Sequence, residues 1–156
     1  MFQGFDDEAA IGKRLRRLSD LIDQDAKRFY DTQDVLFEQR WFGVLNQLVM
    51  HGPMSVSELS KALRISHVSV SETRKSLEQA KLITSKPDKT DGRVKRLTFT
   101  KSGARLVETM QPIWLALEEA SQEINREARN IVAALDRLDA VLTKKSLFER
   151  ASDKLK

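Results

Sequence analysis

The segment 55–99 constrains the fold of this chain most, because it carries several local signals in a fixed order. Residues 55–58 fit a capping box, in which the Ser55 hydroxyl accepts from the backbone N–H of Glu58 while the glutamate reaches back. A short helix follows, and a three-residue turn leads into a second helix predicted over 67–80, with Ser66 as its N-cap. Two short helices joined in this way are typical of a helix-turn-helix.

Apolar spacing assigns a buried and an exposed face to this helix pair. The residues predicted to be buried are Leu59, Ala62, Leu63, Val70, Thr73 and Leu77. The outer face of the second helix is polar and consists of His67, Ser69, Ser71, Glu72 and Lys75. Small polar side chains at the start of a helix suit contacts with phosphates or base edges, although serines there often serve only as caps.

A β-hairpin is predicted directly after the helix pair. Residues 82–86 and 94–99 alternate in polarity, and the separator 87–93 contains Pro, Asp and Gly, which favour a turn. The tip of this hairpin is basic. We therefore expect a central winged helix-turn-helix domain over 37–100.

Within this domain, a first helix over 37–50 is closed by Gly52, as a left-handed C-cap, and by Pro53.

Long amphipathic helices are predicted on both sides of this domain, over 1–36 and 101–156. In the second of these segments, Pro112 predicts a kink rather than an end. The apolar stripes are Ile11, Leu15, Leu18, Ile22, Ala26 and Phe29, and then Leu106, Met110, Ile113, Leu117, Ala120, Ile124, Ala128, Ile131, Leu135, Leu138 and Leu142. Near-heptad stripes favour pairing in a two-fold dimer, with an intramolecular bundle as the alternative.

The composition excludes several classes of protein. At 156 residues there is space for one domain with helical extensions, and no apolar run reaches the roughly 20 residues that span a bilayer. The acidic residues 1–8 do not read as a secretory signal, so we expect a cytoplasmic protein. The absence of cysteine excludes thiolate metal sites, and His51 and His67 do not form a metal-ligand pattern. No nucleophile or phosphate-binding motif indicates an enzyme or a cofactor.

The charge is unevenly distributed along the chain. The segment 61–105 holds twelve basic and four acidic residues, although the net charge of the whole chain is only +4. Such a block is typical of a phosphate-binding surface, and the alternative is a solvated basic face.

The order of these elements resembles the MarR family over nearly the whole chain. The segments that carry the resemblance are 55–63, 65–71, 77–83, 88–93 and 97–103. The resemblance also extends to the regulator half of relatives fused to an acetyltransferase, through 37–42, 135–138 and 146–150, and we expect no acetyltransferase activity here.

The resemblance implies a mainly α-helical homodimer with a small β-hairpin wing that binds double-stranded DNA at a palindromic operator, as a repressor. It implies that Asp91 orients Arg93 toward the minor groove. The DNA-binding residues expected are Ser66, His67, Ser69, Ser71, Lys75, Lys89, Arg93, Lys95 and Arg96. Glu72 and Arg74 depart from the family pattern and leave the base contacts open. The alternative function is a winged-helix module that binds proteins without specific DNA binding.

Many relatives bind a small effector between the dimerisation helices and the DNA-binding lobe. The residues that could line such a site are Tyr30, Trp41, His51 and Trp114. Ordinary core packing is the alternative for each of them, because aromatic residues at helical spacing usually fill space.

Overall fold

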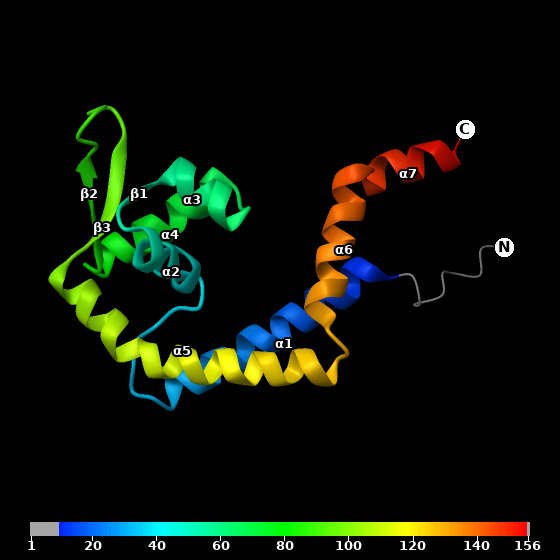
Figure 1. Ribbon diagram of the computed structural model, residues 1–156, viewed down its shortest axis with the longest axis horizontal. Coiled ribbons are helices and arrows are strands. Elements are labelled where there is room, and N and C mark those ends of the chain that lie inside the picture. Colours follow the sequence, from blue (N-terminus) through cyan, green and yellow to red (C-terminus); the bar gives the residue numbers. More distant parts are fainter. Residues whose placement is uncertain (1–9, 156) are drawn as a thin grey trace. The chain divides into compact units, whose positions relative to one another are not determined.

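The computed structural model describes residues 10–155, which form seven helices and one small sheet. The acidic segment 1–8, which argued against a secretory signal, lies outside the described residues. The elements are α1 (Ile11–Asp31), α2 (Trp41–His51), β1 (Met54–Ser55), α3 (Val56–Leu63), α4 (His67–Gln79), β2 (Ile83–Pro87), β3 (Lys95–Phe99), α5 (Lys101–Glu127), α6 (Ile131–Lys144) and α7 (Leu147–Lys154) (Figure 1). The predicted class, mainly α with a winged helix-turn-helix, is confirmed.

The chain divides into two units, residues 1–111 and 112–156. Each has its own set of contacts, and α5 begins in the first and ends in the second. The predicted domains 1–36, 37–100 and 101–156 were defined by their expected roles, whereas these two units are defined by contacts within the chain. The predicted division stays a prediction. Along residues 10–155, none of the helices combines the length and the apolar character needed to cross a membrane.

The capping box of α3 forms as the sequence indicates. The Ser55 hydroxyl accepts from the N–H of Glu58 at 3.2 Å, and the Ser55 N–H donates to the Glu58 carboxylate at 2.7 Å. Leu59 is fully buried, but Ala62 is exposed and Leu63 is half-buried, so the predicted burial was wrong for Ala62. A helix of only eight residues places a single row against the core, and that row runs through Leu59.

The turn between α3 and α4 is held by backbone and hydroxyl groups. Arg64 ends α3 in the left-handed conformation, with φ 53° and ψ 39°. The N–H of Ile65 donates to the carbonyl of Ser60 at 3.3 Å, and the Ser60 hydroxyl donates to the carbonyl of Ile65 at 2.6 Å. Ser66 then caps α4 by accepting from the N–H of Ser69 at 3.1 Å. These hydrogen bonds fix the direction in which α4 leaves the turn.

The wing belongs to a three-stranded antiparallel sheet with the order β1-β3-β2. Pairing Ile83 with Phe99 and Pro87 with Lys95 gives the predicted hairpin. The third strand was not predicted: Met54 pairs with Leu97, and Ser55 pairs with Arg96. Thus β1 ties the root of the wing to the start of α3.

The exit from β3 into α5 requires a glycine. Thr100 donates from its N–H to the carbonyl of Leu82 at 3.1 Å and from its hydroxyl to the carbonyl of Lys81 at 2.7 Å. The same hydroxyl accepts from the N–H of Gly103 at 3.0 Å. A Cβ at Gly103 would lie 1.9 Å from the Leu82 carbonyl oxygen, so no larger residue fits without moving the backbone.

Helix α2 begins at Trp41, four residues later than predicted. Phe37 instead lies in the loop before the helix, where its side chain is buried. Its ring packs edge-on against Tyr30 at 4.8 Å and against Trp41 at 5.8 Å between centroids. All three rings are buried. The end of α2 also differs from the prediction, since Gly52 has φ 74° and ψ −153° rather than the left-handed helical conformation. That region is open essentially to glycine alone, and it sends the chain into β1.

The second unit contains the end of α5, then α6 and α7. Helix α5 passes through Pro112 without ending, as predicted. The apolar rhythm predicted to run on through Ala128 is interrupted, because Arg129 and Asn130 both have positive φ. Asn130 caps α6 by accepting from the N–H of Ala133 at 3.4 Å, and Asn125 accepts from the N–H of Val132 at 3.0 Å. Two asparagines thus mark the boundary between α5 and α6.

Candidate nucleic-acid interface

Helix α4 presents its polar face to solvent. Val70, Thr73 and Leu77 are buried as predicted, and the Thr73 hydroxyl donates to the carbonyl of Ser69 at 3.0 Å. The exposed residues of α4 are His67, Val68, Ser69, Glu72, Lys75 and Gln79, while Ser71 is half-buried. Hydroxyl, imidazole, ammonium and methyl groups are therefore offered on one helix face, and these groups contact base edges and phosphates in DNA complexes.

The helix is anchored from behind by α2. The indole N–H of Trp41 donates to the Ser76 hydroxyl at 2.9 Å, and the Arg40 guanidinium donates to the same oxygen at 3.0 Å. At the N-terminal end, the hydroxyls of Ser66 and Ser69 lie 2.9 Å apart. Ser66 is thus occupied as a cap but keeps an exposed side chain.

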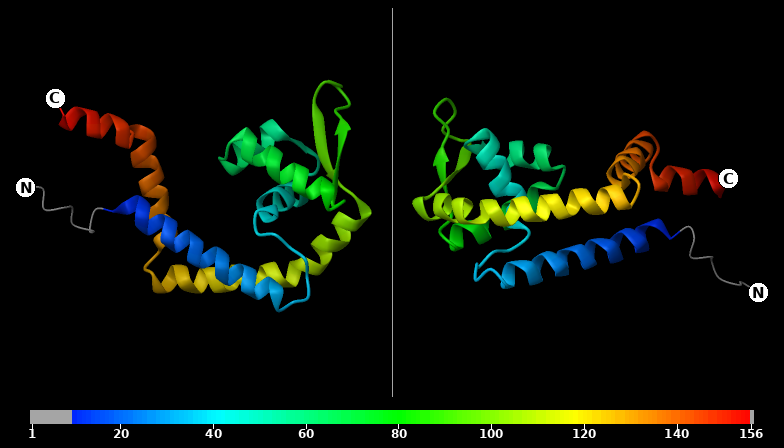
Figure 2. Two further views of the ribbon diagram at one scale, coloured as in Figure 1. Left: turned by 180° about the vertical axis from the view of Figure 1, so that it is seen from behind. Right: turned by 60° about the horizontal axis from the view of Figure 1, so that its bottom comes forward.

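The wing tip carries a preformed carboxylate–guanidinium pair. Asp91 accepts from the Nε of Arg93 at 3.3 Å and from the backbone N–H of Arg93 at 3.1 Å. The Arg93 side chain is 93% exposed, so its guanidinium projects into solvent despite this pair. Lys89 and Lys95 are exposed on the same hairpin. In both views of Figure 2 the loop between β2 and β3 projects beyond α2, α3 and α4.

Arg96 differs from this exposed set, because its side chain is only 34% exposed and is held by hydrogen bonds. Its guanidinium donates to both oxygens of Glu58, at 2.9 and 3.2 Å, and to the carbonyl of Pro53 at 3.1 Å. Its Nε donates to Asp88. The five N–H donors of an arginine are largely used by these contacts, which leaves little to offer a phosphate.

The electrostatics of this cluster favour its charged form. Hydrogen bonds from Thr90, then from Arg96 and the backbone of residues 90 and 91, hold the pKa of Asp88 far below its ordinary range. The backbone N–H of Ser55, assisted by Arg96, lowers the pKa of Glu58. Asp88 and then Glu58 raise the pKa of Arg96. All three groups are therefore ionised at neutral pH.

The two residues that depart from the family pattern have different environments. Arg74 is half-buried, with its Nε 3.9 Å from the carboxylate of Glu78, so it lies on the flank of α4 and not on its outer face. Glu72 lies on the exposed face. Of the two departures, Glu72 is thus the one on the exposed face of α4. The basic residues of 61–105 that are exposed are Lys61, Arg64, Lys75, Lys81, Lys86, Lys89, Arg93, Lys95, Lys101 and Arg105.

The residues predicted to line an effector site have different environments. Tyr30 and Trp41 are buried on either side of Phe37, and the Tyr30 hydroxyl donates to Gln39 at 2.7 Å. His51 is exposed at the end of α2, and the half-buried Trp114 belongs to the second unit. Tyr30 and Trp41 thus have the core-packing role weighed as the alternative.

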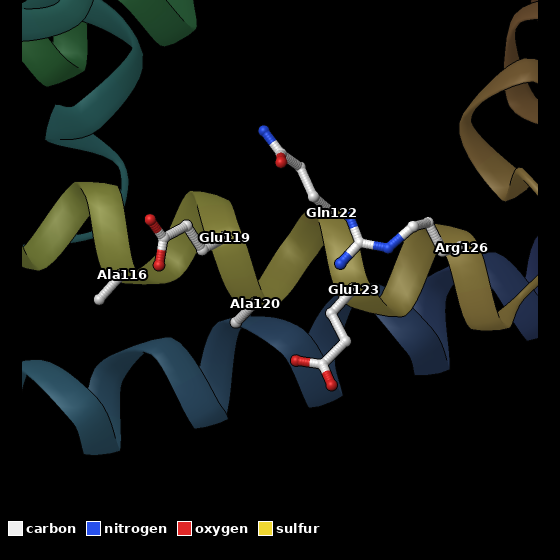
Figure 3. A pocket seen from close by; sticks show the side chains of 6 residues that line it. All are labelled: Ala116, Glu119, Ala120, Gln122, Glu123 and Arg126. Atoms are coloured by element: carbon white, nitrogen blue, oxygen red, sulfur yellow. The ribbon is translucent and has the colours of Figure 1, made fainter.

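A hollow does lie along α5, but it contains none of these four residues. Figure 3 shows that its lining comes entirely from that helix: Ala116, Glu119, Ala120, Gln122, Glu123 and Arg126. One helix face cannot enclose a ligand, so we assign no site to it. Within residues 10–155, no cluster of three or more His, Cys, Asp or Glu side chains could hold a metal ion.

Sequence reasoning missed Val68, whose side chain is 67% exposed on the outer face of α4. A helical wheel would have found it, because Val68 lies between Lys75 and Glu72 when positions advance by 100° per residue. It also missed Ser76, whose role depends on contacts with residues more than thirty positions away in the sequence.

Comparisons with known proteins relate the central part of the chain to one family. The family model described as "MarR family" matches residues 37–94, which include α2, α3, α4, β2 and the wing tip. Over these residues the chain is similar to the MarR family. No curated protein matches it.

Solved structures place the same fold over most of the chain. A MarR/EmrR family transcriptional regulator from Acinetobacter sp. ADP1 is 20% identical with a TM-score of 0.73, covering 90% of this chain and 99% of that one. S. aureus MepR, in a complex with DNA, is 24% identical with a TM-score of 0.70, covering 84% and 97%. Bordetella bronchiseptica BpsR, whose DNA binding is regulated by 6-hydroxynicotinic acid, is 24% identical with a TM-score of 0.70, covering 88% and 98%. These likenesses show that the chain shares the fold of these regulators.

Proposed function

We propose that this chain is a regulator of the MarR family, a homodimeric repressor that binds a palindromic operator. The observation that carries the proposal is the pairing, within one unit, of an exposed polar face on α4 with a hairpin whose tip displays Arg93. A recognition helix and a wing read adjacent grooves, and a two-fold dimer repeats them on a symmetric site.

In this proposal, the N-terminal half of α4 enters the major groove. His67, Ser69 and Ser71 contact base edges or phosphates, and Lys75 contacts a phosphate. Ser66 contributes mainly by capping the helix, because its oxygen already accepts from Ser69. Val68 adds an apolar group that suits the methyl group of thymine. Glu72 favours a cytosine amino group, since a carboxylate is repelled by phosphate.

The wing supplies the minor-groove contact. Asp91 holds the Arg93 guanidinium near its own carboxylate while leaving it exposed, so little ordering is needed when DNA arrives. A narrow minor groove attracts an arginine strongly. Lys89 and Lys95 add nonspecific attraction to the backbone.

The terminal helices support the dimer. Several large apolar residues of α1 and α6, among them Leu15, Ile22 and Leu135, keep between 38% and 62% of their surface exposed in the single chain. Stripes of this kind are usually covered in solution, and a second copy offers the same stripes. A dimer lying across a promoter would block transcription, which is the basis for proposing repression.

Release by a small effector completes the proposal. Its support is the relative BpsR, whose DNA binding responds to 6-hydroxynicotinic acid. The probe is therefore 6-hydroxynicotinic acid with related aromatic acids, added to the protein–DNA complex. Release at millimolar probe, absent with benzoate as a control, would support it, and no release by any of them would remove it.

The function is tested by selecting duplexes from a random library with the full chain, followed by fluorescence anisotropy on the selected duplex. We expect a palindrome, bound at least about 1,000-fold more tightly than a scrambled duplex. Arg93→Ala should weaken binding by about 1–3 kcal/mol without changing the sedimentation of the protein. Failure to enrich any sequence, at low and at physiological salt, would contradict the proposal and favour a protein-binding module.

A further inference from the structure

Arg96 joins three segments of the chain through one guanidinium. Its Nη1 and Nη2 donate to the two carboxylate oxygens of Glu58 in the first turn of α3, at 2.9 and 3.2 Å. Its Nη1 also donates to the carbonyl of Pro53, before β1, and its Nε donates to Asp88 at the start of the wing turn. The side chain is 34% exposed, so it lies against the protein and does not project from it.

Asp88 connects Arg96 to the turn at the wing tip through hydrogen bonds of its two carboxylate oxygens. While its Oδ2 faces Arg96, its Oδ1 accepts from the N–H of Thr90 at 2.8 Å, the hydroxyl of Thr90 at 2.6 Å and the N–H of Asp91 at 3.0 Å. Its own N–H donates to the carbonyl of Val94 at 2.8 Å, which closes the turn. The side chain of Asp88 is only 11% exposed.

Asp91 is the last link, because its carboxylate accepts from both the N–H and the Nε of Arg93. An unbroken series of hydrogen bonds therefore runs from Glu58 through Arg96, Asp88 and Asp91 to Arg93. It begins in the helix-turn-helix and ends at the group proposed to enter the minor groove. The lowered pKa of Asp88 and of Glu58 keeps the series ionic at neutral pH.

We propose that Arg96 is a positioning residue for DNA binding: through Asp88 and Asp91 it holds Arg93 in place relative to α4, and it does not itself contact phosphate. This inference rests on the proposed function, in which Arg93 contacts DNA. A guanidinium fork is required, because a lysine can neutralise Glu58 or Asp88 but cannot bridge both with directed hydrogen bonds.

The test is a double-mutant cycle on the selected duplex with the full chain, using R93A, R96Q and both together. R93A should weaken binding about 5- to 150-fold. R96Q should weaken it about 2- to 13-fold, since the wing tip must then be ordered on binding. If Arg96 acts through Arg93, the double variant binds within about twofold of R93A alone, whereas independent contacts would multiply the two losses.

Two further readouts separate positioning from direct contact. In the R93A background, R96Q should leave unchanged the slope of log Kd against log salt, whereas a lost phosphate contact would reduce that slope by about 0.9. R96K should lose nearly as much affinity as R96Q, while a residue that only contacts phosphate would tolerate lysine. Lys95→Gln, which removes an exposed charge from the neighbouring position, is the matched control and should multiply with R93A.

The outcomes distinguish the two proposals. If R93A binds as tightly as the wild type, the proposed wing contact fails. If R93A weakens binding but the R96Q loss multiplies with it, or R96K binds like the wild type, the positioning role of Arg96 is wrong and the DNA-binding function stands. Melting curves by circular dichroism show whether R96Q is folded, and where it is not, D88N replaces R96Q in the cycle with the same expectations.

Discussion

The helix-turn-helix region differs from the three helices α1, α6 and α7 in where it places its apolar side chains. In the first, Leu45, Leu59, Val70, Leu77 and Leu97 have at most a trace of surface exposed. In the second, α6 and α7 contain no buried residue, and α1 buries only Ala26 and Tyr30. The first region completes its core within one chain, whereas the second leaves apolar surface exposed in the single chain.

The hydrogen bonds follow the same division. The wing and the helix-turn-helix are joined by contacts between residues far apart in sequence, such as Arg96 with Glu58 and Trp41 with Ser76. Side-chain bonds in α6 and α7 join residues close in the sequence, as between Lys145 and Asp153. Long-range contacts make the first region cooperative, so we expect changes there to affect the whole unit and changes in the second to affect assembly.

The largest effect is expected from a substitution in α6 that prevents dimer formation and leaves the buried core unchanged. Leu135→Glu places a charge in the exposed stripe of α6, and we expect sedimentation at micromolar concentration to show a monomer. Operator affinity should then fall at least about 100-fold, because the two recognition helices no longer bind as one unit. Arg137→Glu, on the opposite face of α6, is the control and should remain dimeric. A dimeric L135E variant would show that this stripe is not the interface.

The next effect tests how tightly the first region is packed. Gly103→Ala forces a Cβ toward the Leu82 carbonyl oxygen, and we expect it to lower the free energy of unfolding by about 1–3 kcal/mol, measured by urea denaturation. Gly12→Ala in α1 is the matched control, since its Cβ would meet only the tip of Arg16 at 4.0 Å. That control should be neutral or stabilise by about 0.5–1 kcal/mol, because alanine favours a helix. Equal effects at the two glycines would contradict the close approach of Gly103 to the backbone of Leu82.

Two identical capping boxes allow a sharper comparison. Ser55 with Glu58 starts α3, and Ser146 with Glu149 starts α7. We expect Ser55→Ala to lower the free energy of unfolding by about 1 kcal/mol, because α3 is part of the cooperative core. Ser146→Ala should only fray α7, which hydrogen exchange detects while the unfolding midpoint stays nearly unchanged. A midpoint shift as large as that of S55A would place α7 in the cooperative unit.

The smallest effect is a pH dependence confined to the wing. Asp88 has a pKa far below its ordinary value of 3.8, so its contribution to stability is complete above that value. It is lost as the pH falls from there toward the folded-state pKa. We expect the amide protons of Thr90 and Asp91 to stay protected at pH 5 and to lose protection as the pH falls below about 4. In D88N they should be unprotected at every pH, and protection that ignores both acid and D88N would contradict the turn described above.

Local signals predicted the parts of the fold that depend on neighbouring residues. The Ser55 box, the Ser66 cap and the turn before Arg93 each need only contacts within three residues, so sequence spacing suffices. The strand β1 is two residues long and has no alternation to detect. The late start of α2 depends on Phe37 packing between two rings, which is a tertiary choice.

The same reasoning explains what was missed at the candidate interface. The basic block led to the expectation that Arg96 contacts DNA, because charge alone cannot tell an exposed arginine from one held by carboxylates. Its partner Glu58 lies 38 positions away in the sequence. Arg93, by contrast, has its partner Asp91 two residues away, and this is the pairing that the resemblance implied. The DNA contact itself stays a prediction.

The hydrogen bond between Trp41 and Ser76 makes the intrinsic fluorescence of Trp41 sensitive to the position of α4. The indole is buried and its N–H is fixed to α4, so any displacement of that helix changes the polarity and hydrogen bonding of the ring. Trp114 is the only other tryptophan in the sequence, and a Trp114→Phe variant leaves Trp41 as the single indole emitter. Its emission then reports the movement of α4 during titration with DNA or small molecules, with no label attached.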